Sequence, residues 1–323
     1  MQLIRGRHNL RARHRGCVVT IGNFDGVHLG HQAILAQVVA KARELGAKST
    51  VMLFEPQPAE FFAPDKAPAR LMTLRDKLTA LAETGVDQVL CLRFNRALAS
   101  LSAQAFVDEL LVAGLDTRYL VVGDDFRFGA GREGDAEFLR RAGAAAGFAV
   151  ADTATVEVDG ERVSSTRLRA ALAAQDFAQV ARLCGRPYCI SGRVRYGDQL
   201  GRTLDCPTAN LALAMVQAPV AGIYMVRVTG AGLDGWPGVA SCGTRPTVNG
   251  QDNRLEVHLL DFAGDLYGQH LTVELLQFLR PELKFDSLAA LQAAIHADID
   301  QARLFFSTKQ TVISNTTEQQ DTP

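Results

Sequence analysis

Short apolar runs and longer segments of helical spacing alternate along the first half of the chain. The run from Val18 to Ile21 has the length and the β-branched content of a buried strand, whereas apolar residues recur at helical spacing from Gln32 onward. The expected strands are 18–21, Ser49 to Phe54, Val86 to Leu92, Tyr119 to Val122 and Phe148 to Ala151. The expected helices are 32–45, Leu74 to Glu83, Ala103 to Leu111 and Glu133 to Ala145. This alternation predicts an α/β fold in which helices connect the strands of a parallel sheet.

The pattern changes near Gly185. Eleven glycines lie between Gly185 and Gly250, too many for long helices, and they separate short apolar runs. The expected strands are Ile190 to Arg195, Ala209 to Leu213, Gly222 to Val228, Gly238 to Ser241, Leu255 to Leu260 and Leu271 to Leu276. Six short strands predict a small antiparallel β-barrel.

A helix is expected after the barrel, beginning at Ser287, because Leu288, Leu291, Ile295 and Ile299 recur at helical spacing. The segment 307–323 is polar and has no periodicity, which predicts a disordered tail. We therefore expect an α/β domain over 1–184, a barrel domain with its closing helix over 185–306, and the tail.

Composition narrows the class of partner. The chain has 323 residues, 47% of them hydrophobic, and a formal net charge of −1, which argues against a nucleic-acid groove and favours small-molecule ligands. The six cysteines form no Cys-x-x-Cys pair and are expected to be reduced. No apolar run approaches the roughly 18 residues of a membrane span, and 1–15 is basic and polar with no apolar core behind it. These features predict a cytoplasmic protein without a membrane partner, and a weak homo-oligomer stays an open alternative.

The first candidate site follows the strand 18–21. Gly22 and Gly26 allow a tight loop and close backbone approach, and His28 and His31 lie three residues apart on one face at the start of the next helix. Backbone N–H groups at a helix N-terminus bind anions, and imidazoles can donate to phosphoryl oxygens. The pattern favours attack on a nucleotide α-phosphate, while a surface histidine pair or a partial metal site is the alternative.

Two further strings could open onto the same edge of the sheet. The string 123–129 follows a predicted strand and contains Asp125, Phe126 and Phe128; a solvated turn is the alternative. The string 164–169 combines three hydroxyl residues with Arg169. Helix capping explains one hydroxyl, whereas the hydroxyls together with an arginine suit the β- and γ-phosphates of ATP.

In the second half, Pro207 fixes a bend from which Thr208 and Asn210 project near the mouth of the barrel. Taken alone, Pro-Thr-x-Asn is a common turn. No Gly-Lys dipeptide and therefore no P-loop occurs, and the chain has no His-Arg-Asp catalytic loop, so no general kinase motif supports phosphoryl transfer.

These strings together resemble one protein family. The string 22–31, Gly-Asn-Phe-Asp-Gly-Val-His-Leu-Gly-His, is similar to the signature of the HxGH nucleotidyltransferases in the form used by bacterial bifunctional riboflavin kinase/FAD synthetases. The string 164–169 resembles the second nucleotidyltransferase signature, and 207–210 resembles the Pro-Thr-Ala-Asn motif of riboflavin kinases. Further strings at 243–247, 256–259, 261–262 and 265–268 match in the same order. The resemblance spans about residues 16–303.

The resemblance implies a Rossmann-like nucleotidyltransferase domain followed by a riboflavin kinase barrel. It implies that riboflavin is phosphorylated to FMN and that FMN is adenylylated to FAD with release of pyrophosphate, with ATP as co-substrate and Mg²⁺ as cofactor. It assigns the general base to Glu256, the metal to Thr208, and catalytic roles in the other domain to His28, His31 and Arg169. The resemblance assigns nucleotide contacts to Gly22, Phe24, Gly26, Ser164, Ser165, Thr166 and Asn210. The flavin and nucleotide cleft is assigned to Asp125, Phe126 and Phe128.

Five residues at three places in the chain depart from the family pattern. Gln57 stands where the family commonly has His, Asp205-Cys206 replaces Gly-Phe, and Ser241-Cys242 replaces Asn followed by an aliphatic residue. The last two flank the kinase site and could alter flavin or nucleotide affinity. Two alternatives stay open: a nucleotidyltransferase with a different phosphorylated acceptor, and a flavin-binding sensor without turnover.

Overall fold

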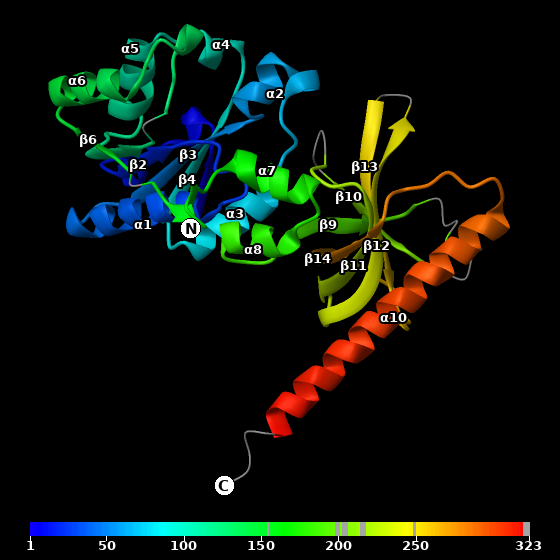
Figure 1. The fold of residues 1–323 in the computed structure, drawn as a ribbon. Helices are drawn as coiled ribbons and strands as arrows, with labels where there is room; N and C mark the ends of the chain where they lie inside the picture. Colours follow the sequence, from blue (N-terminus) through cyan, green and yellow to red (C-terminus); the bar gives the residue numbers. More distant parts are fainter. Residues whose placement is uncertain are drawn as a thin grey trace. The chain divides into compact units, whose positions relative to one another are not determined.

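The computed structural model describes residues 1–123, 125–153, 155–197, 201, 206–213, 218–247 and 250–318. The chain divides into two compact units (Figure 1). The first consists of Met1–Pro68 and Leu74–Arg167, and the second of Ala69–Thr73 and the chain from Leu168 onward.

The first unit is built on a parallel six-stranded sheet of order β1-β4-β3-β2-β5-β6. Its strands are β1 (Gln2–Arg5), β2 (Val18–Ile21), β3 (Ser49–Glu55), β4 (Gln88–Arg93), β5 (Tyr119–Val122) and β6 (Ala149–Asp152). The central strands are buried on both faces, which is why they read as continuous apolar runs. The predicted parallel sheet is confirmed, with β1 added as an unpredicted edge strand.

Helices cover both faces of this sheet (Figure 1). Those of the first unit are α1 (Leu29–Glu44), α2 (Pro58–Phe62), α3 (Leu74–Glu83), α4 (Arg96–Ala99), α5 (Ala103–Phe106), the π-helix η4 (Val107–Val112) and α6 (Ala136–Ala146). Short 3₁₀ turns are η1 (Arg7–Asn9), η2 (Ala12–His14), η3 (Pro64–Lys66) and η5 (Ala130–Arg132), and a small hairpin pairs β7 (Glu157–Val158) with β8 (Glu161–Arg162). Helices α5, η4 and α6 pack on one face around Phe106, Leu110 and Leu139, and α1 packs on the other through Val38 and Ala42.

The order of the strands fixes where a ligand can bind. The chain passes from β2 to β3 and β4 on one side of the sheet and continues at β5 and β6 on the other. The order therefore reverses between β2 and β5. Ligands of open parallel sheets bind at such a reversal, outside the carboxyl ends of the strands.

The second unit is a closed antiparallel barrel of order β10-β13-β12-β11-β14-β9. Its strands are β9 (Cys189–Arg195), β10 (Ala209–Ala212), β11 (Gly222–Gly230), β12 (Leu233–Thr247), β13 (Gly250–Leu259) and β14 (His270–Arg280). The predicted six-stranded barrel is confirmed. Strand β12 is far longer than the predicted Gly238 to Ser241, because Leu233, Trp236 and Pro237 before that range also pair with β11 and the residues 242–247 after it also pair with β13.

Helices of the second unit lie against this barrel. Helix α7 (Ser165–Ala173) begins in the first unit and ends in the second, and α8 (Phe177–Cys184) sets the ring of Phe177 at 5.8 Å from that of Tyr224. Helix α10 (Leu288–Glu318) runs along the barrel (Figure 1), where Ile299 and Ala302 pack among barrel residues.

Residues 307–318 of the predicted tail continue α10, and the expected disorder of the tail stays a prediction. The hydroxyls of Ser307 and Thr308 both donate to the carbonyl of Leu304, so these polar residues satisfy their side chains within the helix. Extending an existing helix also costs much less than nucleating one. Residues 319–323 of the predicted tail lie outside the described residues.

Candidate active sites

The loop between β2 and α1 has an unusual backbone. Phe24 and Val27 have positive φ angles of 46° and 40°, and Gly26 between them has φ 89°. Non-glycine residues avoid this region, and such strain concentrates at functional sites. Phe24 and Val27 are buried, with exposed fractions of 2% and 0%, so core packing holds the loop in this conformation.

His28 and His31 are brought together as predicted. Their rings stack at 3.6 Å with an angle of 16° between the planes. His28 is the N-cap of α1, and its Nδ1 accepts a hydrogen bond from the backbone N–H of His31 (3.3 Å). Because Nδ1 is an acceptor, neutral His28 carries its proton on Nε2. Gly30 permits this arrangement, since a Cβ there would lie 3.2 Å from the His28 ring and 3.3 Å from the carbonyl oxygen of Val163.

The electrostatic setting keeps His31 neutral. Burial lowers the pKa of His31 well below its usual range, and the electrostatic effects of the neighbouring His28 and Lys77 lower it further. Lys77, on α3, is itself only 1% exposed. The buried Nδ1 of His31 has no hydrogen-bond partner among the described residues. A neutral imidazole with an unpaired nitrogen beside positive charge suits an anionic ligand.

The start of α7 meets the histidine loop. Ser165 Oγ donates to the carbonyl oxygen of Asp25 (2.9 Å), and Ser164 Oγ accepts from the N–H of Arg167 (3.2 Å). Ser164 is therefore the capping hydroxyl, Ser165 ties α7 to the loop, and Thr166 is exposed. Arg169 lies one turn further along, in the second unit, where its Nε donates to the carbonyl of Ala69 (2.6 Å). Its contact with phosphate stays a prediction.

The described residues of the string 123–129 differ in how far their side chains are buried. Asp125 is exposed and forms an ion pair with Arg162 (3.6 Å), and Phe126 is partly buried. Phe128 is 6% exposed and packs in the core against Phe106 and Phe138, with ring centroids 5.2 and 5.9 Å away. This packing gives Phe128 a structural role beside the expected one at the cleft. Asp124 lies outside the described residues.

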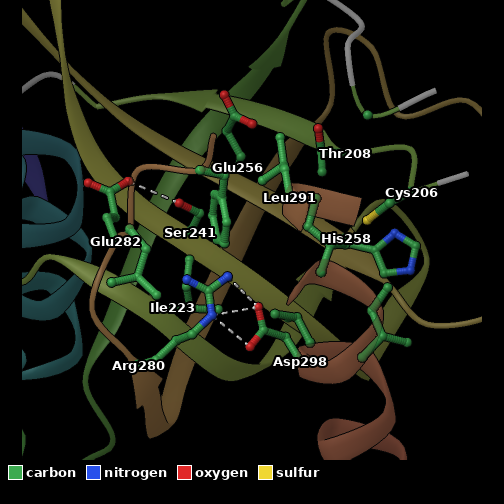
Figure 2. A pocket seen from close by; sticks show the side chains of 16 residues that line it. Cys206, Thr208, Ile223, Ser241, Glu256, His258, Arg280, Glu282, Leu291 and Asp298 are labelled. Atoms are coloured by element: carbon green, nitrogen blue, oxygen red, sulfur yellow. Dashed lines mark hydrogen bonds and ion pairs between the residues drawn. The ribbon is translucent and has the colours of Figure 1, made fainter. Parts of the chain in front are cut away.

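In the barrel, the strand register brings the kinase candidates together. Glu256 on β13 pairs with Asn210 on β10 and with Ser241 on β12. Asn210 Nδ2 lies 3.5 Å from Thr208 Oγ1. Glu256 and Thr208 both line a pocket of about 260 Å³ (Figure 2). Hydroxyl, amide and carboxylate groups thus meet at one end of the barrel.

This first pocket is apolar with a few polar groups. Its apolar lining comes from barrel strands, from the segment between β14 and α10, and from α10 itself, namely Ile223, Val239, Leu283, Phe285, Leu291, Ile295 and Ile299. Arg280 and Asp298 form a hydrogen-bonded ion pair in its wall, with Nη2–Oδ2 at 2.7 Å and Nε–Oδ1 at 3.0 Å, away from Glu256 in Figure 2. Ser241 Oγ donates to Glu282 (3.3 Å). Sequence reasoning missed this ion pair, because its members are 18 residues apart and carry no motif.

The segment that carries Thr208 is held by close packing. The N–H of Cys206 donates to the carbonyl of Gly201 (2.8 Å), and His258 Nδ1 lies 3.0 Å from the carbonyl oxygen of Pro207. A Cβ at Gly201 would lie 2.3 Å from the carbonyl oxygen of Cys206, so only glycine fits there. Burial raises the pKa of Cys206 to about 11, which makes it a neutral packing residue. Asp205 lies outside the described residues.

A second pocket of about 450 Å³ adjoins the first at Thr208, which lines both. Its wall includes Tyr196 and Tyr267, whose rings stack at 3.9 Å. Thr208 therefore lies between an apolar pocket and a pocket with aromatic walls.

Comparison with known proteins shows the family. Residues 10–167 match the model of the FAD synthetase family, and residues 184–306 match that of the riboflavin kinase family. A bifunctional riboflavin kinase/FMN adenylyltransferase of Pseudomonas fluorescens is 58% identical over 306 residues, which are 94% of this chain and 97% of the relative. The chain belongs to the bifunctional riboflavin kinase/FMN adenylyltransferase family. The Escherichia coli K12 member is 54% identical over 95% of this chain and 98% of its own length.

Both candidate sites of this family member fall within the matched regions. The histidine loop and Ser164 to Thr166 lie in the FAD synthetase match, and Thr208, Asn210 and Glu256 lie in the riboflavin kinase match. Arg169 lies between the two matches.

A solved structure shares the architecture. The crystal structure of a protein titled a macrolide-efflux protein from Streptococcus pneumoniae is 29% identical, with a TM-score of 0.76 over 94% of this chain and 99% of that one. In the described part of this chain, no helix is long and apolar enough to cross a membrane.

Proposed function

We propose that the chain carries out both reactions of its family, riboflavin phosphorylation in the barrel and FMN adenylylation in the parallel-sheet unit. The observation that carries the barrel assignment is the register of Glu256 with Asn210, at the end of a pocket that Thr208 also lines. In the other unit, the stacked His28 and His31 stand at the carboxyl end of β2, where such folds bind nucleotides.

The first reaction is assigned to the two adjoining pockets. The apolar pocket suits the flavin ring of riboflavin, and the pocket with stacked tyrosines suits the adenine of ATP. Glu256 takes the proton of the ribityl 5′-hydroxyl. The oxygen of that hydroxyl attacks the γ-phosphorus of ATP, and ADP leaves. Thr208 lines both pockets, which supports a role for its hydroxyl at the phosphoryl group in transfer.

The donor groups near Glu256 fit Mg²⁺. Thr208 and Asn210 offer a hydroxyl and an amide oxygen, which are hard ligands of the kind that Mg²⁺ prefers. Among the described residues, no three His, Cys, Asp or Glu side chains gather into a metal site, which agrees with an ion held largely by nucleotide phosphates and water. When bound, Mg²⁺ would neutralise charge on the phosphates.

The second reaction needs no general base, because the phosphate of FMN is already an anion. Its oxygen attacks the α-phosphorus of ATP, and the bond to pyrophosphate breaks. His28 can donate from Nε2 to the phosphoryl oxygens, and the neutral His31 stacks against it. Catalysis here consists of positioning and charge stabilisation.

The test is to incubate the purified protein with riboflavin, ATP and Mg²⁺ and to separate the flavins by chromatography. We expect FMN first and then FAD. Formation of FMN without FAD, also when FMN is supplied, would refute the adenylyl assignment. FAD from supplied FMN without any FMN from riboflavin would refute the kinase assignment, and no turnover would favour a flavin-binding sensor.

A further inference from the structure

Gln57 is a buried polar residue whose side-chain nitrogen is unsatisfied. It lies two residues after the end of β3 and is 7% exposed. Its Nε2 makes no hydrogen bond within the described part of the chain. Burying an amide N–H without an acceptor costs free energy, so native proteins seldom leave one unpaired without a functional reason.

The backbone around Gln57 is well fixed. Its N–H donates to Glu60 Oε2 (2.9 Å), and Glu60 is 9% exposed. Pro56 and Pro58 restrict the chain on both sides. The unpaired amide is therefore held in place by its surroundings and does not belong to a loose loop.

A second unsatisfied atom lies at the same edge of the sheet. Strands β2 and β3 are parallel neighbours, with Ile21 opposite Met52, so the segments after them leave the sheet on the same side. His31, in the segment after β2, has an unpaired buried Nδ1. Two unsatisfied nitrogens at the carboxyl edge, from adjacent strands, indicate a ligand that supplies hydrogen-bond partners there.

The position of β3 suggests which substrate Gln57 meets. The nucleotide crevice lies between β2 and β5, and β3 is on the other side of β2. Attack on the α-phosphorus requires the incoming oxygen to be opposite the leaving pyrophosphate, so the acceptor phosphate must approach from beside the nucleotide. A carboxamide N–H is a neutral donor and therefore suits a phosphate oxygen.

We propose that Gln57 Nε2 donates a hydrogen bond to the phosphate of FMN and so positions it for attack on ATP. This inference rests on the proposed adenylyl function. It assigns a role in acceptor recognition to the buried side-chain amide of Gln57.

The test uses the full-length chain and the conversion of supplied FMN to FAD. Gln57→Leu keeps the size of the side chain and removes the donor. We expect it to raise KM for FMN by about 10-fold, the scale of one hydrogen bond to a charged group, with KM for ATP within about 2-fold of the parent value. Gln57→Glu should raise KM for FMN further, because its carboxylate repels the phosphate. Gln57→His should stay close to the parent protein.

A matched control separates recognition from folding. Gln88 is also buried and also has an unpaired side-chain atom, but it lies at the amino end of β4, away from the carboxyl edge. Gln88→Leu should lower the melting temperature without changing KM for FMN. In every variant, the rate of riboflavin phosphorylation shows whether the barrel unit is intact.

Three results would overturn the inference: an unchanged KM for FMN in Gln57→Leu, a rise in KM for ATP instead, or an equal rise in KM for FMN in Gln88→Leu. A parent protein that makes no FAD at all would refute the proposed function itself. The two failures are therefore distinguishable.

Discussion

At the scale of single residues, His28 has a structural role and an expected catalytic role, and substitutions can separate the two. It caps α1 through Nδ1, and its ring stacks on His31 where phosphoryl oxygens are expected. His28→Ala should slow FAD formation by about 10²-fold, the usual loss for one transition-state donor. His28→Asn restores a capping side chain without the imidazole, so it should recover stability but not the rate. Flavin chromatography and thermal melting measure the two effects, and equal losses of both activities would point to a folding role.

The neutral state of His31 predicts how stability depends on pH. Because burial lowers the pKa of His31 in the folded state, the unfolded state binds the proton more readily below about pH 6.5. The stability that His31 contributes as a neutral group is therefore present above that pH and is lost as the pH falls. His31→Gln cannot titrate, so its melting temperature should fall less than that of the parent between pH 7.5 and 5.5. A fall of the same size in both proteins would contradict this account.

The site residues show what a sequence can and cannot give. The motif strings single out His28, His31, Ser165, Thr208 and Glu256 as candidates, because the expected chemistry depends on residue types at fixed local spacing, and their roles stay predictions. The unpaired Nε2 of Gln57 and the ion pair of Arg280 with Asp298 could not be predicted, since they depend on burial and on pairing between distant segments.

At the scale of elements, long runs with a clear period were predicted well, and their exceptions have local causes. The parallel sheet, α3 and the barrel follow the pattern. Helix α6 begins at Ala136, later than expected, because Asp135 accepts from the N–H of Phe138 and caps it there. Strand β1 was not predicted, because only two of its four residues, Leu3 and Ile4, are apolar.

The ion pair of Arg280 with Asp298, in the wall of the apolar barrel pocket, joins β14 to α10, and we expect it to hold the helix over the pocket. Asp298 is 5% exposed, so Asp298→Ala leaves the Arg280 charge uncompensated and should cost about 3–5 kcal/mol in unfolding free energy. It should also raise KM for riboflavin. The double variant Arg280→Met with Asp298→Leu should recover most of the stability, as chemical denaturation can show. A double variant as unstable as Asp298→Ala would mean that the charge is not the cause.

At the scale of the whole molecule, the two activities should be separable. Residues 1–184 should convert FMN to FAD, and residues 185–306 should convert riboflavin to FMN. The compact second unit also includes 168–184, where Phe177 packs against the fully buried Tyr224. A fragment of 168–306 should therefore melt at a higher temperature than 185–306 and make the same product. If the fragments fold and neither is active, the division of the sites is wrong.

The central claim is that two reactions run at two separate sites, and Glu256→Gln in the full-length chain tests it most directly. The substitution keeps the shape of the side chain and removes the base. We expect riboflavin phosphorylation to fall by about 10²- to 10⁴-fold in turnover, while FAD formation from supplied FMN stays at the parent rate. Phosphorylation within a few-fold of the parent rate, or an equal loss of FAD formation, would contradict the account.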